Sequence, residues 1–115
     1  MPMQHKRLVI VWLSTDRQAA IDMAMLYARD SLLNGWWQEV DFFLWGPTVD
    51  AAANSEPVQT EIELMQSVGV QVTACLACAS RYHVVDQLEQ AGIPCRGLGE
   101  QLTEDLAEGS PVIFI

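Results

Sequence analysis

Short runs of apolar residues alternate along this chain with stretches in which apolar residues recur every three or four positions. Leu8 to Leu13 is continuous and rich in β-branched residues, which is typical of a strand buried on both faces of a parallel sheet. From Ala20 to Leu32 the apolar spacing predicts an amphipathic helix, with N-cap oxygens at residues 14–16 and a stop at Asn34-Gly35. Val40 to Trp45 is a second apolar run, so these elements predict a β-α-β unit with parallel strands.

The middle of the chain predicts two further elements before the next strand. Residues 48–54 are small and Ala-rich, which indicates a short helical turn or loop. Pro57 is expected to interrupt the chain there, and the spacing of Thr60 and Glu63 predicts a capping box that opens a helix running to Val68-Gly69.

The last third repeats the alternation of strand and helix. Residues 70–74 alternate apolar and polar positions, as a short strand does, and the Ala-rich segment after them favours a helix. A helix over residues 84–91, a short strand within 93–97 and a helix ended by Gly109 follow. Pro111 to Ile115 is expected to be a final strand buried inside the sheet. The pattern predicts an α/β three-layer sandwich around a mostly parallel sheet of four or five strands.

Composition and charge narrow the class of protein. The chain has 115 residues, half of them apolar, which predicts one domain over residues 1–115. Its net charge of −9 argues against nucleic acid or an anionic membrane as a partner. No apolar run is long enough to cross a bilayer. The three cysteines do not resemble the dense disulfide framework of a small secreted protein, so we expect a cytoplasmic location.

The strongest candidate chemistry is the pair Cys75 and Cys78, where the third strand gives way to a helix. Unpaired backbone N–H groups and the positive end of the helix dipole favour a thiolate at such a junction. The alternative is that both cysteines are small buried apolar residues. We expect Cys75, the first residue after the strand, to lie at the open lip of the junction, with Cys78 one turn later either facing inward or standing behind Cys75.

Neighbouring residues add weaker candidates. Arg81 lies six residues after Cys75, where it would favour a thiolate or hold an anionic sulfur group, or else be an ordinary exposed cation. His83 is expected to be a surface or packing residue rather than a base, and Cys95 to lie in the core rather than to act as a third thiol at the site. A zinc site from three cysteines and His83 is disfavoured, because there is no second C-x-x-C or His pair. The late position of the motif also argues against a thioredoxin-type site.

Large aromatic residues are numerous for a domain of this size. Trp36 and Trp37 flank a predicted helix end, where one small core can hardly bury both. They are either loop and core packing or part of a subunit interface, where tryptophan is enriched.

The order of elements and three short segments resemble the DsrE/DsrF-like sulfur-relay family. The segments are Lys6 to Val11, Phe42 to Gly46 and, above all, Gly69 to Cys78. In relay members, the cysteine after the third strand carries sulfur as a persulfide, and the matching residue here is Cys75, with Arg81 at a position that is often arginine. The resemblance implies trimers or hexamers with the cysteine near a subunit boundary. The family's usual glycine after the arginine is absent, since Tyr82 and His83 follow Arg81.

Three functions remain open from the sequence. The first is a sulfur carrier that uses Cys75, with Cys78 as a second thiol and Arg81 as an electrostatic aid, served by donor and acceptor proteins. The second is a non-catalytic oligomeric domain that binds a small ligand or a protein. The third is a thiol–disulfide oxidoreductase that uses the Cys75 and Cys78 pair. None of these predicts a metal or a cofactor.

Overall fold

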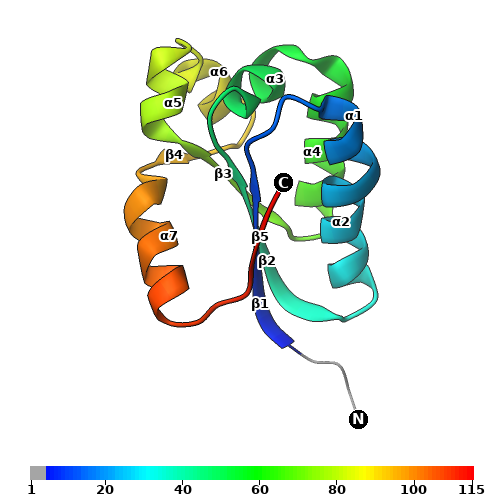
Figure 1. Cartoon of the computed structure of the whole chain (residues 1–115). Coiled ribbons are helices and arrows are strands. Elements are labelled where there is room, and N and C mark those ends of the chain that lie inside the picture. The colour runs from blue at the N-terminus through cyan, green and yellow to red at the C-terminus, as the bar shows by residue number, and fades with distance from the viewer. Residues whose placement is uncertain (1–4) are drawn as a thin grey trace.

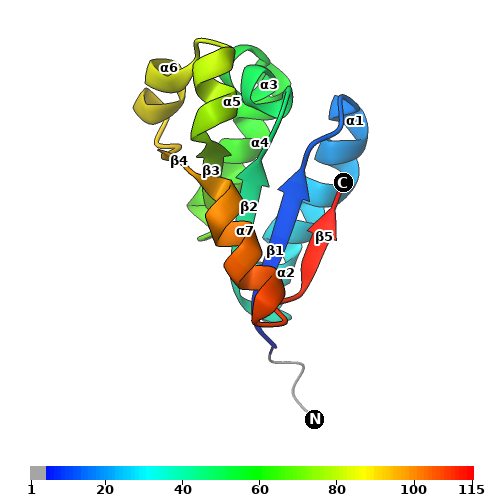
Figure 2. The ribbon, with the colours of Figure 1, turned by 60° about the vertical axis from the view of Figure 1, so that its left-hand side comes forward.

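A computed structural model, which describes residues 5–115, contains a five-stranded sheet in which every strand pairing is parallel. The strand order is β4-β3-β2-β1-β5, as Figure 2 shows from the edge strand β5 across to β4. The strands are β1 (His5–Trp12), β2 (Trp37–Leu44), β3 (Gln71–Cys75), β4 (Cys95–Arg96) and β5 (Val112–Phe114). The predicted α/β sandwich with a mostly parallel sheet is therefore confirmed.

Helices cover the two faces of the sheet unequally (Figure 1). One face packs against a single helix, α7 (Leu98–Ala107), through Val9, Val11 and Phe43. The opposite face carries the larger core. It is covered by α4 (Glu56–Ser67) and by the consecutive helical segments α1, η1 and α2, which span residues 17–33. The remaining helices lie towards the carboxyl ends of the strands. The bounds are α1 (Arg17–Ala19), the π-helix η1 (Ala20–Met25), α2 (Leu26–Leu33), α3 (Thr48–Asn54), α4 (Glu56–Ser67), α5 (Leu76–Arg81) and α6 (Val85–Gln90).

Helix α4 begins earlier than the sequence pattern predicted. It starts at Glu56 and includes Pro57 in its first turn, so the expected capping box at Thr60 and Glu63 is wrong. The first-turn N–H groups of a helix have no partner within the helix, so a proline costs nothing there and its fixed φ suits the helix. By contrast, the N-cap of α1 is as expected, because the Asp16 side chain accepts a hydrogen bond from the Ala19 N–H.

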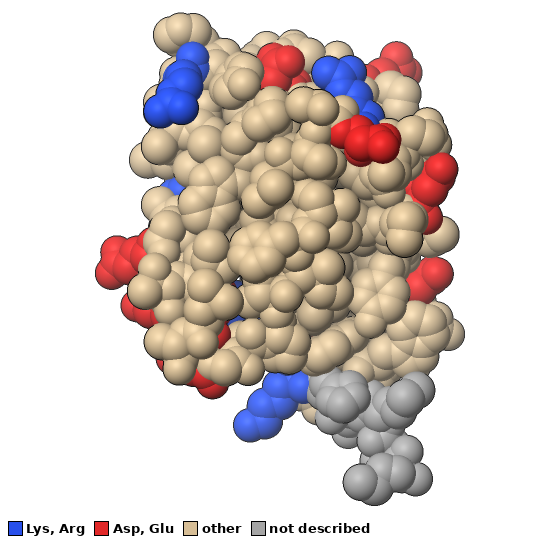
Figure 3. Space-filling view, in the orientation of Figure 1, with Lys and Arg blue, Asp and Glu red and all other residues tan. Residues whose placement is uncertain are grey.

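Strand β5 is an edge strand, and the expectation of a last strand buried inside the sheet is wrong. Among the described residues it pairs with β1 alone, and Ile113 and Phe114 are exposed. A continuous apolar run indicates a strand but cannot distinguish a central strand from an edge strand. The face around β5 is largely free of charged residues, as Figure 3 shows.

An ion-pair cluster fastens α7 to the sheet at the end opposite the cysteines. The guanidinium of Arg7 on β1 donates to the carboxylates of Asp41 on β2 and Asp105 on α7. Asp105 has a side chain only 3% exposed, and Gln101 donates to it as well. Burial raises the pKa of the Asp41 carboxyl, although hydrogen bonding to Arg7 and its charge act in the opposite direction. Two buried carboxylates therefore depend on one arginine.

Within residues 5–115, the helices are all too short or too polar to cross a lipid bilayer.

Replacing Arg7 by methionine should destabilise the fold by about 3 kcal/mol, because breaking a buried ion pair leaves charged groups uncompensated. Urea denaturation at neutral pH measures the change. The loss should shrink in acid, because Asp41 with its raised pKa takes up a proton readily and no longer needs a counter-ion. The control is Arg17→Met at an exposed site, expected to change stability by less than about 0.5 kcal/mol. Equal stabilities of the two variants would show that the cluster contributes nothing.

Candidate functional site

Parallel strand pairing brings three segments of the chain together at the carboxyl edge of the sheet. Leu44 at the end of β2 pairs with Ala74 of β3, and Cys75 pairs with Arg96 of β4. The turn after β2, the Cys75 to Cys78 motif and the end of β4 therefore lie side by side. This edge is where ligands bind in open α/β sheets.

Cys75 is the last residue of β3 and also the N-cap of α5. Its side chain faces α7 and packs with Leu98, which leaves the residue only 5% exposed. The expectation that Cys75 lies at the open lip is therefore wrong. The reason is the strand's alternation: Cys75 points to the same side as Thr73, and α7 covers that face of the sheet.

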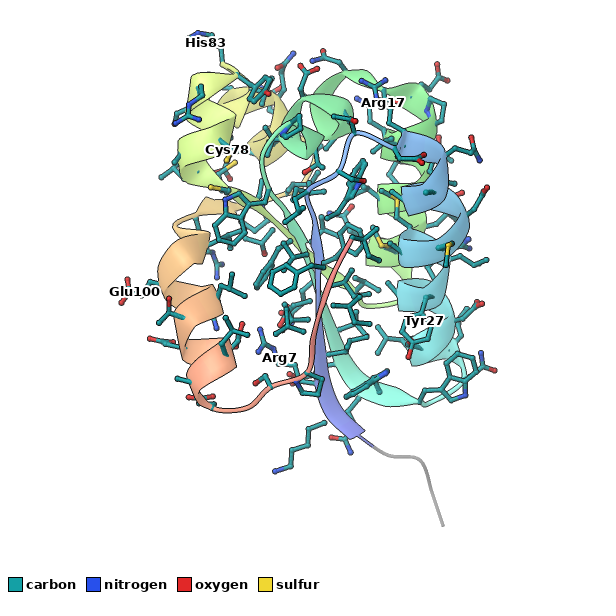
Figure 4. All side chains as sticks on the ribbon, viewed as in Figure 1. Arg7, Arg17, Tyr27, Cys78, His83 and Glu100 are labelled. Carbon is teal, nitrogen blue, oxygen red and sulfur yellow. The ribbon has the colours of Figure 1, made fainter. Side chains whose placement is uncertain are left out.

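Cys78 is the more accessible of the two thiols, contrary to the expectation that it faces inward or stands behind Cys75. Figure 4 shows it on α5 at the carboxyl end of the sheet. Its Sγ accepts a hydrogen bond from the backbone N–H of Gly46, with 3.3 Å between nitrogen and sulfur, and it interacts with the Cys75 thiol. Gly46 has a φ of +65°, a conformation that glycine adopts at little cost, and it presents this N–H to the sulfur.

Opposing effects set the acidity of Cys78. Burial makes the largest contribution and raises its pKa, and the neighbouring Cys75 raises it further. The hydrogen bond from Gly46 and the charge of Arg81 lower it, but the net pKa is above the usual value for cysteine. At neutral pH the thiol form of Cys78 therefore predominates.

Cys95 is half-buried at the start of β4, where it pairs with Ala74, the residue before Cys75. Burial raises its pKa, with smaller contributions from Glu89 and Cys75. All three cysteines are free thiols. Among residues 5–115, no three His, Cys, Asp or Glu side chains form a group that could hold a metal ion.

Arg81 and Arg96 are the two arginines nearest to the thiols. Arg81 ends α5 and acts electrostatically on Cys78. Arg96 is the strand neighbour of Cys75 and lines a polar cavity of about 160 Å³ beneath α7, together with Thr73 and Gln101. Neither Arg96 nor the Gly46 N–H was among the residues expected at the site. Aligning residues 93–97 with the third strand would have placed Arg96 beside Cys75, whereas no sequence signal points to the Gly46 N–H.

His83 does not belong to the thiol site. Its side chain is exposed and lies beyond the end of α5, away from Cys78 (Figure 4). Its φ of +59° is a left-handed conformation that glycine adopts more easily. The helix-ending turn therefore forms without the glycine that the sulfur-relay family usually has near this point.

Residues 14–16 also lie at the carboxyl edge but not with the cysteines. Ser14 and Thr15 line a separate cavity of about 120 Å³ with Arg17 and Thr48. The structure thus divides the residues of this edge into two groups, and only one contains cysteine thiols.

Comparisons with known proteins give structural matches only. No family model and no curated protein matches the chain. The solved structure of BT1422, described as a conserved protein of unknown function from Bacteroides thetaiotaomicron, is 34% identical, with a TM-score of 0.92 over 95% of this chain and 94% of that chain. The YchN protein of E. coli is 15% identical, with a TM-score of 0.67 over 97% of this chain and 99% of that chain.

The likeness to YchN shows the fold alone, and that fold is DsrE-like. At 34% identity over nearly the whole of both chains, this protein belongs to the same family as BT1422.

Proposed function

We propose that this protein is a sulfur carrier in which the Cys75 and Cys78 pair accepts, holds and releases sulfane sulfur. The observation that carries the proposal is the environment of the Cys78 sulfur, which receives the Gly46 N–H and interacts with a second thiol. A hydrogen-bond donor aimed at sulfur stabilises negative charge on it. The DsrE-like fold and the resemblance of residues 69–78 to the sulfur-relay family support the same reading.

Sulfur enters at Cys78, because Cys75 is covered by α7. The Cys78 thiolate attacks the terminal sulfur of a donor persulfide, a new S–S bond forms on Cys78, and the donor leaves as its thiolate. Release reverses this exchange: an acceptor thiolate attacks the terminal sulfur and Cys78 leaves as a thiolate. Neither step needs an external oxidant or reductant. Donor and acceptor are proposed to be proteins that dock near Arg81.

Cys75 is placed either to take over the terminal sulfur of the Cys78 persulfide or to release that sulfur as hydrosulfide. If Cys75 attacks the terminal sulfur, the persulfide moves to a buried site. If it attacks the inner sulfur, hydrosulfide leaves and a Cys75–Cys78 disulfide forms. The second outcome is the route to a thiol–disulfide oxidoreductase, and the contact between the two thiols is the observation that favours it as a second candidate.

The proposal extends to the setting in which the protein works. The resemblance to relay proteins and the free thiols favour a cytoplasmic protein in a homo-oligomer. A non-catalytic oligomeric domain with structural cysteines is the alternative that the first experiment below tests.

Incubating the protein with a persulfide donor should add the mass of one sulfur atom to wild type and to Cys75→Ser but not to Cys78→Ser. Cys78 is the more accessible of the two thiols, and the serine hydroxyl that replaces it cannot form a persulfide. Intact-mass spectrometry, before and after treatment with a reducing agent, gives the readout. Cys95→Ser is the matched control and should load as wild type does.

The other outcomes of this experiment also decide between functions. Loading that persists in Cys78→Ser but disappears in Cys75→Ser would assign sulfur to Cys75, as the sequence resemblance implies. Rapid loss of two hydrogen masses without sulfur uptake would favour the oxidoreductase. No loading of any variant by several donors would leave the non-catalytic domain.

Alkylation of Cys78 should follow its thiolate fraction, so the rate should rise with pH through a midpoint above that of an ordinary cysteine, because burial raises its pKa. Removing the cation with Arg81→Gln should raise the midpoint further and slow the reaction at neutral pH. Removing the neighbouring thiol with Cys75→Ser should lower the midpoint and speed the reaction. These rates are measured in a Cys95→Ser background by peptide mass spectrometry.

Arg17→Gln, at an exposed site on α1 well away from Cys78, is the control and should leave the midpoint unchanged (Figure 4). An alkylation midpoint that is the same in wild type, Arg81→Gln and Cys75→Ser would show that neither group acts on the Cys78 sulfur.

A further inference from the structure

The side chains that surround β5 form an apolar face that is unusual for so acidic a protein. Six large apolar residues around β5, η1 and α2 have side chains exposed by 38 to 69%: Leu13, Met23, Leu26, Tyr27, Ile113 and Phe114. The net charge of −9 lies mainly elsewhere, because this face is almost free of charged residues in Figure 3. Apolar patches of this kind mark contact surfaces.

A groove of about 490 Å³ runs between β5 and the helix η1–α2. Ile10, Met23, Leu26 and Ile113 are among its apolar lining residues. Trp36 also lines it, and its ring lies 6.0 Å from that of Tyr27. One of the two tryptophans that seemed too many for a single core thus lies at this groove.

The outer edge of β5 offers backbone hydrogen bonds. Pro111 and Ile115 bond to β1, through the Val9 N–H to the Pro111 carbonyl and through the Ile115 N–H to the Val11 carbonyl. Because backbone groups of successive strand residues point to opposite edges, the N–H and C=O groups of Val112 and Phe114 point away from the sheet. Such an edge is a template for another strand.

We propose that this face, named here the β5 face, binds the β5 face of a second copy of the chain. The two β5 strands pair antiparallel across a two-fold axis at Ile113. Val112 of each copy then exchanges both hydrogen bonds with Phe114 of the other, and the two Ile113 side chains meet above the grooves. The same surface serves both copies, as a two-fold interface requires.

Charge and area both favour a second copy as the occupant. Two molecules that each carry −9 repel one another over most of their surfaces. The β5 face, whose groove is lined by two charged residues, Asp22 and Asp30, is where they can approach with fewer charges between them. An aromatic side chain carries about 150–250 Å² of surface and an aliphatic one somewhat less. Because these six residues are 38 to 69% exposed, they supply on the order of 500 Å² of apolar area. Backbone and neighbouring polar atoms bring this close to the roughly 800 Å² per partner of a stable interface.

The interface is independent of the proposed thiol chemistry, and oligomeric state tests it. Wild type should sediment as a dimer, or as an assembly of dimers, at micromolar concentration. Ile113→Lys places a charge at the axis and should at least halve the number of subunits, with an unchanged circular dichroism spectrum. Leu64→Lys is the matched control, since Leu64 on α4 is 40% exposed and Ile113 is 38% exposed, and it should assemble as wild type does.

Salt provides a second readout. Asp22 and Asp30 are among the residues that line each groove, so association brings like charges together. Raising the ionic strength screens that repulsion and should strengthen the dimer, whereas an interface held by ion pairs would weaken. Weakening by salt would contradict the proposal.

A disulfide test locates the two-fold axis. Facing residues in a non-hydrogen-bonded antiparallel pair have Cα atoms about 4.5 Å apart, which is within the range that a disulfide spans. In a chain with its three native cysteines replaced by serine, Ile113→Cys should therefore form a covalent dimer on mild oxidation, and Leu64→Cys should not. A wild-type monomer, an odd-numbered assembly such as the trimer that the family resemblance allows, or an assembly unaffected by Ile113→Lys would overturn the proposal.

Discussion

The parallel register of β2, β3 and β4 is the constraint on which the candidate site depends. It places the turn at Gly46 beside Cys78 and the end of β4 beside Cys75, although these residues are far apart in the chain. The main-chain hydrogen bonds that hold the strands together thus also determine which groups surround each sulfur. At the other end of the sheet, Arg7 fastens α7, the helix that covers Cys75. Helix α7 therefore links the ion pairs of Arg7 to the burial of Cys75.

Burial and hydrogen bonding act against each other at Cys78, and this balance suits a carrier better than a permanently activated nucleophile. A sulfur that is largely protonated at neutral pH reacts slowly with unintended electrophiles. The Gly46 N–H and Arg81 favour the anionic form, so they stabilise negative charge on this sulfur when Cys78 loses its proton. The oxidoreductase alternative would use the same two thiols, but its net result would be a disulfide rather than a stored sulfur.

Most of the architecture follows from local sequence pattern, whereas the details of the site follow from tertiary contacts. The apolar runs at residues 8–13 and 40–45 predicted the central strands, because a strand covered on both faces has little choice of residue. The exposure of Cys75 and Cys78 was predicted in the wrong order. It depends on which face α7 covers, and a helix's place over a sheet cannot be seen in the spacing of its apolar residues.

Two other differences have the same origin. The apolar segment from Pro111 to Ile115 has the pattern of a central strand but lies at the edge, where Ile113 and Phe114 are exposed. Pro57 interrupts a pattern of apolar spacing but not a helix, because it falls in the first turn. In each case the residues indicated the kind of element, and long-range packing decided its role.

The most direct test of the central claim is a crystal structure of the protein after incubation with a persulfide donor. If the Cys75 and Cys78 pair carries sulfur as proposed, electron density for one additional sulfur atom should extend from Cys78 Sγ, close to the Gly46 N–H and to Cys75. Unmodified Cys75 and Cys78 in a protein whose Cys95 alone has gained sulfur would contradict the claim.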